Sequence, residues 1–368
     1  MKDSAKKIIV LVPGQNAKGG ITNYYYSIRK FFPTNIIYLE RGVRNWPLKV
    51  SRFNEVVTHL KDYMEFVAMV SKRDVAMVQT TTAFASSSIL RDGIFIFISK
   101  LFRKKTIVFF RGWDDKYVYN ISGVHKKMVY KTFLKADAII DLSVHNIEYL
   151  KQLGYKNKLY LETTLVDESL IENIDIDVCI NNRFNSPKKN ILFLSRIEKT
   201  KGIYEVLEVF KKIKKTHADF NLIYAGDGLE MDLLKQEVAK QNIIDIEFAG
   251  FVKGEKKKNH FINASIFVFL SEFEGMPNAV LEAMAFGLPV ITTNVGGIST
   301  VFNDKKNGRL LDNTNINFIA ENIIDIVYDE EKYKKYSKTN YLEAKNKFWS
   351  SVVAKRMMNI FNTVLEEI

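Results

Sequence analysis

Residues 271–294, SEFEGMPNAVLEAMAFGLPVITTN, hold two carboxylates, Glu274 and Glu282, around a predicted helix start. Pro277 is typical of a first helical turn, and Gly287 predicts the end of the helix. Because Glu282 stands among apolar helix residues, its carboxylate needs a partner, and a ligand hydroxyl would serve. Two carboxylates alone are also compatible with a solvated first turn in which glutamate complements the helix dipole, and this is the plainer interpretation.

The residues around the first turn of that helix are suited to binding an anion. Gly275 lets the backbone come close to a ligand. The backbone amides of Met276, Asn278 and Ala279 would face the same ligand, together with the positive end of the helix dipole. A phosphate is the anion expected there.

A second group of charges follows a predicted strand that ends at Leu194. Arg196 and, after a short loop, Lys201 and Gly202 would reach one cleft. The fork of arginine and the point charge of lysine can together hold a diphosphate. A charge run after a strand is more often a solvated loop, and the residues alone leave both interpretations open.

Glycines stand at two further turns. Gly19 and Gly20 separate the predicted strand 8–13 from a helix, where they would permit close approach of a ligand, although a glycine pair is usually just a turn. Gly226 and Gly228 end another predicted strand, in FNLIYAGDG, and we expect them to allow close packing beside a bound ligand.

Short apolar runs alternate with segments long enough for a helix. In the first half, the predicted strands are 8–13, 35–39, 75–80, 106–110 and 138–143. This alternation predicts parallel α/β sheets with right-handed crossovers. Ligands of such sheets bind at the carboxyl ends of the strands, which is where the charges and glycines described above fall.

The chain of 368 residues is too long for one core of ordinary size and predicts two domains. The asparagine-rich stretch 178–190 is typical of a linker, so the expected domains are residues 1–178 and 186–349. The spacing of apolar residues in 348–368 predicts an amphipathic terminal helix.

Composition limits the classes of protein to consider. An apolar fraction of 47% with 26% charged residues describes a globular chain. The single cysteine, Cys179, excludes an internal disulfide framework or a multi-cysteine zinc site, and predicts a reducing cytoplasm. The longest apolar run, 93–102, is too short to span a membrane, and the first residues resemble a strand more than a signal peptide.

The net charge of +12 is concentrated in the first half. Residues 1–180 carry 27 basic against 18 acidic side chains, and residues 181–368 carry 27 against 24. This excess suits contact with anionic lipid headgroups or a lipid phosphate. Because no nucleic-acid-binding motif accompanies it, nucleic acid is not an expected partner. A charge that only solubilises the protein is an equal alternative.

The stretch FEGMPNAVLEAMAFGLPVI, with Glu274 and Glu282 as its acidic ends, resembles the E-x7-E signature of family 4 retaining glycosyltransferases of the GT-B fold. Further similar segments follow the family's order: LSRIEKTKGI (194–203), YAGDG (224–228), FAGFV (248–252), NVGGI (294–298) and NGRLL (307–311). The resemblance covers the second half of the chain. It implies two facing Rossmann-like domains with a terminal helix, about residues 350–368, that crosses back to the first domain.

The resemblance also implies an activity: a retaining, metal-independent transfer of a sugar, without a cofactor. The second domain would hold a nucleotide-sugar, with a UDP-sugar favoured and a GDP-sugar as the alternative. The first would hold a saccharide or lipid-linked acceptor. The family's usual work points to bacterial polysaccharide or glycolipid assembly in the cytoplasm, with peripheral contact at the inner face of the membrane. The donor sugar, the acceptor and the oligomeric state stay open.

By the same resemblance, Arg196 and Lys201 would bind the diphosphate of the donor. Glu274 would orient the hydroxyls of the donor sugar, and Glu282 would bind the ribose. Phe251 and Val252, at the end of the predicted strand 246–252, would line the pocket for the base. Gly19 and Gly20 match a glycine pattern at which the family binds phosphate.

Residues 111–117, RGWDDKY, contain one departure from the family, because relatives often place a histidine at about Arg111. Arg111 would supply a positive charge near the diphosphate, Trp113 would stack on a sugar, and Asp114 would accept a hydrogen bond from an acceptor hydroxyl. An ion pair between Arg111 and Asp114 or Asp115 that clamps the loop is an equal alternative.

A second departure is Thr300, where relatives commonly carry a glutamate, so donor contacts in that loop are in doubt. The missing histidine keeps a second class of function open, a nucleotide-sugar-binding subunit without catalysis. A sugar-nucleotide epimerase of the same fold would share the phosphate cleft, but its additional acid and base residues are not identifiable in this sequence.

Overall fold

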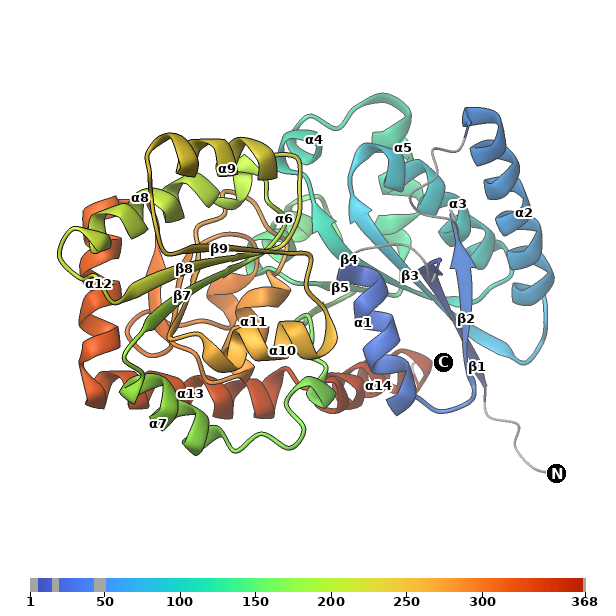
Figure 1. Ribbon diagram of the computed structural model, residues 1–368. Coiled ribbons are helices and arrows are strands. Elements are labelled where there is room, and N and C mark those ends of the chain that lie inside the picture. The colour runs from blue at the N-terminus through green and yellow to red at the C-terminus, as the bar shows by residue number, and fades with distance from the viewer. Residues whose placement is uncertain (1–5, 15–19, 43–50, 367–368) are drawn as a thin grey trace. The chain divides into compact units, whose positions relative to one another are not determined.

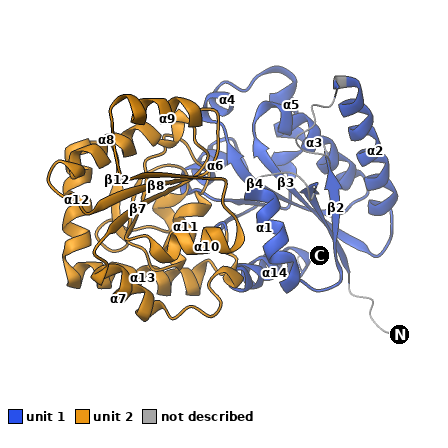
Figure 2. Cartoon of the chain, in the orientation of Figure 1, with its two compact units in different colours: residues 1–164, 350–368 blue, residues 165–349 orange. Residues whose placement is uncertain are grey.

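The computed structural model describes residues 6–14, 20–42 and 51–366. It divides the chain into two compact units, unit 1 with residues 1–164 and 350–368, and unit 2 with residues 165–349 (Figures 1 and 2). Each unit contains a six-stranded sheet that is covered by helices.

The sheet of unit 1 has the strand order β2-β1-β3-β4-β5-β6, and its strand pairs are parallel. Its strands are β1 (Lys7–Pro13), β2 (Ile36–Arg41), β3 (Val75–Phe84), β4 (Lys105–Trp113), β5 (Ala138–Asp141) and β6 (Lys158–Leu161). The interior of β1 is a continuous apolar run that is buried throughout, as expected for a strand between two layers of helices.

The helices of unit 1 are α1 (Gly20–Ile28), α2 (Arg52–Val70), α3 (Ser86–Leu101), α4 (Asp115–Tyr119), α5 (Gly123–Lys131), α6 (Val144–Gln152) and α14 (Ser350–Glu366). Among them, α1, α2, α3 and α6 contact the sheet, α5 packs on α3, and α14 packs on α1. Figure 1 shows α2 beside α3, and Phe66 of α2 packs on Phe95 of α3 with ring centroids 5.1 Å apart. Both rings belong to a core cluster with residues of β1, β2 and β3.

The last helix of the chain, α14, belongs to unit 1 and packs against α1. This confirms the expected return of the terminal helix to the first part of the chain. Phe361 lies 6.0 Å from the ring of Phe32, and Arg356 forms an ion pair with Glu162 at 2.8 Å. Residues at the two ends of the chain therefore share one core.

The sheet of unit 2 has the order β12-β11-β10-β7-β8-β9. Its strands are β7 (Lys189–Leu194), β8 (Phe220–Ala225), β9 (Ile246–Gly250), β10 (Ile266–Phe269), β11 (Val290–Thr293) and β12 (Gly308–Leu311). After β9 the chain returns to the other side of β7 and continues with β10. This reversal places the loops after β7 and β10 side by side at the carboxyl edge, where open parallel sheets bind ligands.

The helices of unit 2 are α7 (Ile176–Asn185), α8 (Ile203–Lys214), α9 (Met231–Lys240), α10 (Gly254–Asn263), α11 (Asn278–Ala285), α12 (Ile316–Tyr328) and α13 (Glu330–Lys347). α8 shows how the sequence directs packing, since its apolar residues recur at helical spacing and are buried.

The expected linker at residues 178–190 is wrong. These residues form most of α7 and the start of β7, and unit 2 begins at residue 165. Asp175 caps α7 by accepting a hydrogen bond from the amide of Val178, and Arg183 is buried, donating to the carbonyls of Ile262 and Phe286. The polar composition suggested a linker because the helix is anchored by a buried arginine more than by apolar residues.

Candidate functional site

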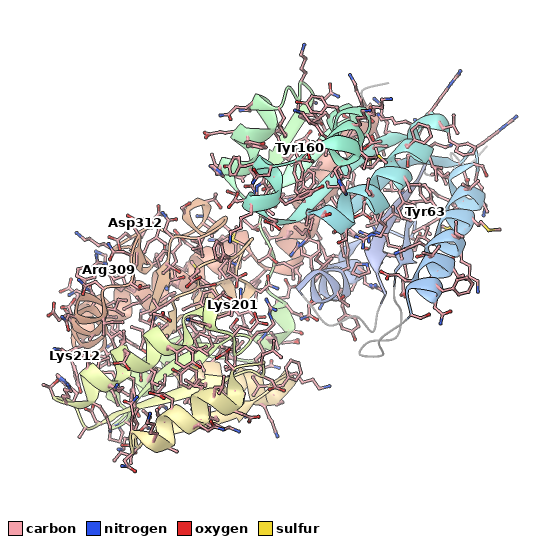
Figure 3. The ribbon with its side chains drawn as sticks, turned by 90° about the horizontal axis from the view of Figure 1, so that it is seen from above. Tyr63, Tyr160, Lys201, Lys212, Arg309 and Asp312 are labelled. Atoms are coloured by element: carbon pink, nitrogen blue, oxygen red, sulfur yellow. The ribbon has the colours of Figure 1, made fainter. Side chains whose placement is uncertain are left out.

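Lys201 and Glu274 meet at the carboxyl edge of the unit 2 sheet (Lys201 is labelled in Figure 3). Lys201 ends a short 3₁₀ helix after β7 and Glu274 lies in the loop after β10. The Lys201 ammonium donates to Glu274 Oε1 at 2.6 Å and to the carbonyl of Phe273 at 3.1 Å. The side chains are 8% and 21% exposed, so the ion pair is partly shielded from water.

Glycines bring the neighbouring loops into backbone contact. Gly202 has a φ of +76°, and a Cβ there would collide with the carbonyl of Leu270. Gly226, with a φ of +149°, and Gly228 lie against the carbonyls of Ser195 and Ile197 in the same way. Close packing is the role expected for Gly226 and Gly228, and it fixes the loop that carries Arg196 and Lys201.

The loop after β11 packs onto the Glu274 segment. The amide of Gly297 donates to the carbonyl of Gly275 at 2.7 Å, and a Cβ at Gly296 would meet the carbonyls of Glu274 and Gly275. Thr300 donates its hydroxyl to the carbonyl of Gly297 at 2.6 Å. The residue that stands where relatives have a glutamate thus stabilises its own loop.

Helix α11 begins one residue later than predicted, with Pro277 as its N-cap and not in its first turn. The carbonyl of Pro277 accepts from the amides of Val280 and Leu281, so the helix start lies directly after Gly275 and Met276. Gly287, with a φ of +63°, follows the last turn as predicted. Of the expected anion-binding amides, those of Asn278 and Ala279 thus belong to the first turn of α11, and that of Met276 lies just before the N-cap.

Glu282 has a protein partner that sequence reasoning missed. Its carboxylate lies 2.6 Å from the ammonium of Lys257 on α10, and the two side chains are 12% and 19% exposed. Lys257 is the middle one of three consecutive lysines after Glu255, and only the register of α10 distinguishes it from its neighbours. The need of Glu282 for a partner was the one available signal.

Arg196 is placed differently from Lys201. Its side chain is 67% exposed, and its guanidinium pairs with Glu198 two residues further on, at 2.7 Å. Within the described residues, the structure brings Lys201 to Glu274 but leaves Arg196 on the exposed side of the loop. Phe251 and Val252 follow β9, and Phe251 is 65% exposed whereas Val252 is buried.

In unit 1, Arg111 belongs to strand β4, which is longer than predicted because Gly112 and Trp113 continue to pair with β3. Its guanidinium lies over the ring of Tyr24 at 4.0 Å and donates to Thr164 Oγ1 at 2.8 Å. Burial lowers the pKa of Arg111. Nε and Nη1 are buried and have no hydrogen-bond partner among the described residues.

The alternative ion pair between Arg111 and Asp114 or Asp115 is wrong, because Arg111 turns toward Tyr24. Asp114 instead caps α4, accepting a hydrogen bond from the amide of Tyr117 at 3.1 Å. Trp113 packs edge-on against Phe84, with centroids 4.8 Å apart, and this contact places its ring in the aromatic core of unit 1.

Sequence reasoning also missed Asp141, at the carboxyl end of β5. Its side chain is buried, and Oδ1 accepts from the amide of Ser143 and the side chain of Asn146 at 2.9 and 2.8 Å. Oδ2 has no partner among the described residues, and burial raises the pKa of Asp141 to about 7. Gly20 begins α1, and Gly19 lies outside the described residues.

Metal-binding clusters and membrane-spanning helices are both absent from the described ranges. These ranges contain no group of three or more histidine, cysteine, aspartate or glutamate side chains placed to hold a metal ion. Nor does any described helix combine the length and apolar character needed to cross a membrane.

The two units together have the GT-B fold of glycosyltransferases. The solved structure of HepE from Anabaena in complex with UDP has a TM-score of 0.75 with this chain. The match covers 97% of this chain and 100% of HepE at 15% sequence identity. Sequence identity at this level supports the fold and not a shared substrate.

Sequence comparison matches the second unit more specifically. The model of the family described as glycosyl transferases group 1 matches residues 180–343, which include Lys201, Glu274 and Glu282. The capsular polysaccharide biosynthesis glycosyltransferase CapM of Staphylococcus aureus is 30% identical over 221 residues, covering 58% of this chain and 55% of CapM. Spore coat protein SA of Bacillus subtilis is 30% identical over 183 residues, covering 47% and 48%. The chain spans about half the length of the curated relatives it matches.

Proposed function

We propose that this protein is a glycosyltransferase that moves a sugar from a nucleotide-sugar to a saccharide or lipid-linked saccharide acceptor in bacterial polysaccharide or glycolipid assembly. The observation that carries the proposal is the ion pair between Lys201 and Glu274 beside the start of α11. A UDP-sugar is the favoured donor, supported by the UDP bound to HepE, and a GDP-sugar is the alternative. CapM, by its name, works in capsular polysaccharide biosynthesis.

In the proposed donor complex, the diphosphate lies between Lys201 and the first turn of α11. Lys201 exchanges part of its contact with Glu274 for phosphate oxygens, which frees the carboxylate to orient the hydroxyls of the sugar. Arg196 leaves Glu198 and adds a second cation, since an exposed arginine can change rotamer at little cost. Stabilising the growing charge of the leaving group in this way is typically worth roughly 10²–10³-fold in rate per contact.

The remaining proposed contacts are with the ribose and the base of the donor. Glu282, held by Lys257, binds the ribose, and the exposed ring of Phe251 stacks on the base with Val252 beneath it. In unit 1, Asp114 accepts a hydrogen bond from an acceptor hydroxyl, and Arg111 and Gly20 contribute to binding phosphate. No metal ion or cofactor is part of the proposed reaction.

We propose retention of anomeric configuration by attack from the same face. The acceptor oxygen forms a bond to the anomeric carbon as the bond to the diphosphate oxygen breaks. The acceptor proton passes to that departing oxygen, so the products are the glycoside and the protonated nucleoside diphosphate. Proton NMR of the product would test this, because an inverted anomeric coupling constant contradicts it.

A thermal-shift screen with UDP, GDP, ADP and their sugar conjugates, each with and without EDTA, tests the donor site. A ligand at about 100 times its Kd stabilises the protein by about 2.7 kcal/mol. We expect one nucleotide to raise the melting temperature whether or not EDTA is present, and Lys201→Ala to abolish the shift. Lys199→Ala is the matched control, since Lys199 is an exposed lysine of the same loop. No shift with any nucleotide, or equal loss in both variants, contradicts the proposal.

Turnover distinguishes catalysis from binding alone. With a donor that gives a thermal shift, we expect transfer of labelled sugar to an acceptor, slowed roughly 10²-fold or more in Glu274→Gln while donor binding is retained. A wild-type protein that binds the donor but transfers to no acceptor would be a nucleotide-sugar-binding subunit. Conversion of the free nucleotide-sugar to an epimer would identify an epimerase.

A further inference from the structure

Helix α2 carries a row of large apolar side chains on its outer surface. Phe53, Val56, Leu60, Met64 and Val67 are 76%, 57%, 56%, 73% and 38% exposed. Their spacing of three or four residues puts all five on one face of the helix. We call this face the α2 stripe. It runs over 14 residue steps, or about 21 Å of helix.

The opposite side of α2 is fixed to unit 1, so the helix cannot rotate to bury the stripe. Phe66 and Val70 are fully buried in the core, and Tyr63 packs on Phe95 with ring centroids 4.7 Å apart. Asp62 is also buried and accepts a hydrogen bond from the amide of Gly42 at 2.7 Å. The outward position of the α2 stripe is therefore a property of the folded unit.

Helix α3 extends the apolar surface. Phe97 and Leu101 are 59% and 69% exposed and lie one turn apart, while Phe95 and Ile96 on the same helix are buried. Helix α3 packs beside α2 (Figure 1), so both of these neighbouring helices carry large exposed apolar residues. Exposed apolar residues that gather on adjacent helices, unlike single ones, mark an interaction surface.

The exposed charged residues on α2, α3, α5 and the segments directly after them are mostly basic. On and directly after α2, α3 and α5, the exposed basic residues are Lys61, Lys72, Arg73, Arg103, Lys126, Lys127, Lys131 and Lys135. The exposed acidic residues described on these three helices are Glu55 and Glu65. Large exposed apolar side chains, on a unit whose exposed charges on these helices are mostly basic, complement an anionic lipid bilayer. The apolar residues would enter the boundary between headgroups and acyl chains.

We propose that the α2 stripe docks unit 1 onto an anionic lipid bilayer. Phe53, Leu60 and Met64 enter the boundary between headgroups and acyl chains, and the basic residues contact lipid phosphates. Self-association through the stripe is disfavoured, because a two-fold contact would bring the mostly basic helices of two copies together. The proposal does not rest on the sugar transfer, but it gives a lipid-linked acceptor a reason to lie near unit 1.

Flotation with vesicles tests the proposal on the full chain. The probes are vesicles of phosphatidylcholine alone and of phosphatidylcholine with phosphatidylglycerol. We expect binding to the anionic vesicles, weakened by salt, and much weaker binding to the neutral ones. In a triple variant, Phe53→Ser with Leu60→Ser and Met64→Ser, binding should fall at least about tenfold.

The matched control removes equally exposed apolar residues from unit 2, as Leu229→Ser with Leu233→Ser and Ile244→Ser. Leu229, Leu233 and Ile244 are 91%, 54% and 70% exposed. The control should bind anionic vesicles like wild type, and both triple variants should keep the wild-type melting temperature because the substituted side chains lie in solvent.

Insertion is measured separately from electrostatic adsorption. An environment-sensitive fluorophore on Leu60→Cys, in a Cys179→Ser background, should shift its emission to shorter wavelength with anionic vesicles. Absence of wild-type binding, equal binding by the α2 variant, or an unshifted emission would overturn the proposal. So would a dimer in sedimentation velocity that the α2 variant alone dissociates, since the occupant would then be a second copy of the chain.

Discussion

Asp141 is an acid within an apolar strand, and its protonation should couple folding to pH. Burial raises its pKa from 3.8 in the unfolded chain to about 7. Between these values the folded protein retains a proton that the unfolded chain has released, so the stability contributed by Asp141 is present at low pH and is lost as pH rises. The free energy of unfolding that Asp141 contributes at low pH is at most about 4 kcal/mol, at about 1.4 kcal/mol per unit of pKa.

Asp141→Asn isolates this effect because asparagine keeps the oxygen that accepts from Ser143 and Asn146. We expect the unfolding free energy of the variant, relative to wild type, to increase steadily from about pH 4 to about pH 7. Urea unfolding at several pH values measures it. If the unfolding free energies of the two proteins change with pH in parallel, Asp141 does not titrate in this range.

Residue types and their spacing predicted which loops of unit 2 would be brought together, but not how their side chains pair. By the resemblance, Lys201 was expected at the diphosphate of the donor and Glu274 at its sugar, and the two side chains are in contact. Arg196 was given the same role, yet its exposed side chain pairs with Glu198, two residues further on, and the sequence pattern did not show which way this side chain would turn. For Asp141, the missing information was that the end of β5 is buried.

At the scale of elements, the sequence predicted the alternation of strands and helices well and their ends less well. β3 was expected over 75–80 and extends to Phe84, because the threonines after Gln79 are β-branched and pair with β4. The same pairing carries Arg111 from an expected loop into a strand. Strand ends depend on neighbours that are distant in sequence, and local composition does not reveal them.

The ion pair between Lys257 and Glu282 joins helices α10 and α11, and it predicts a stability effect. Lys257→Met would leave the carboxylate of Glu282 largely desolvated without a partner. Because the pair is 19% and 12% exposed, we expect a loss of about 1–3 kcal/mol, less than for a fully buried pair.

A double-mutant cycle measures this coupling by urea unfolding. Adding Glu282→Gln to Lys257→Met should recover part of the loss, because the uncompensated charge is removed. Lys256→Met is the control, since Lys256 is exposed on the same helix. Additive effects of the two substitutions would mean that the ion pair contributes no stability.

At the scale of the whole molecule, the chain enters unit 2 at residue 165 and leaves it at residue 349, and the two crossings are adjacent. The amide of Val166 donates to the carbonyl of Phe348 at 2.8 Å, and Val166 forms a parallel bridge with Trp349. On the unit 1 side, Arg356 at the start of the returning segment holds Glu162 at 2.8 Å. This topology makes the stability of the first unit depend on the last helix.

Phe361→Ala tests that dependence. Phe361 is fully buried on α14 beside Phe32, and truncating a buried phenylalanine typically costs about 3–5 kcal/mol. Because both residues belong to unit 1, hydrogen exchange should speed up in α1 and in strands β1 to β6, while the strands of unit 2 keep their protection. Phe97→Ala, at an exposed position of unit 1, should change neither the unfolding free energy nor the hydrogen exchange of the two units. Equal loss of protection in the two units would show that they unfold together, with α14 stabilising both.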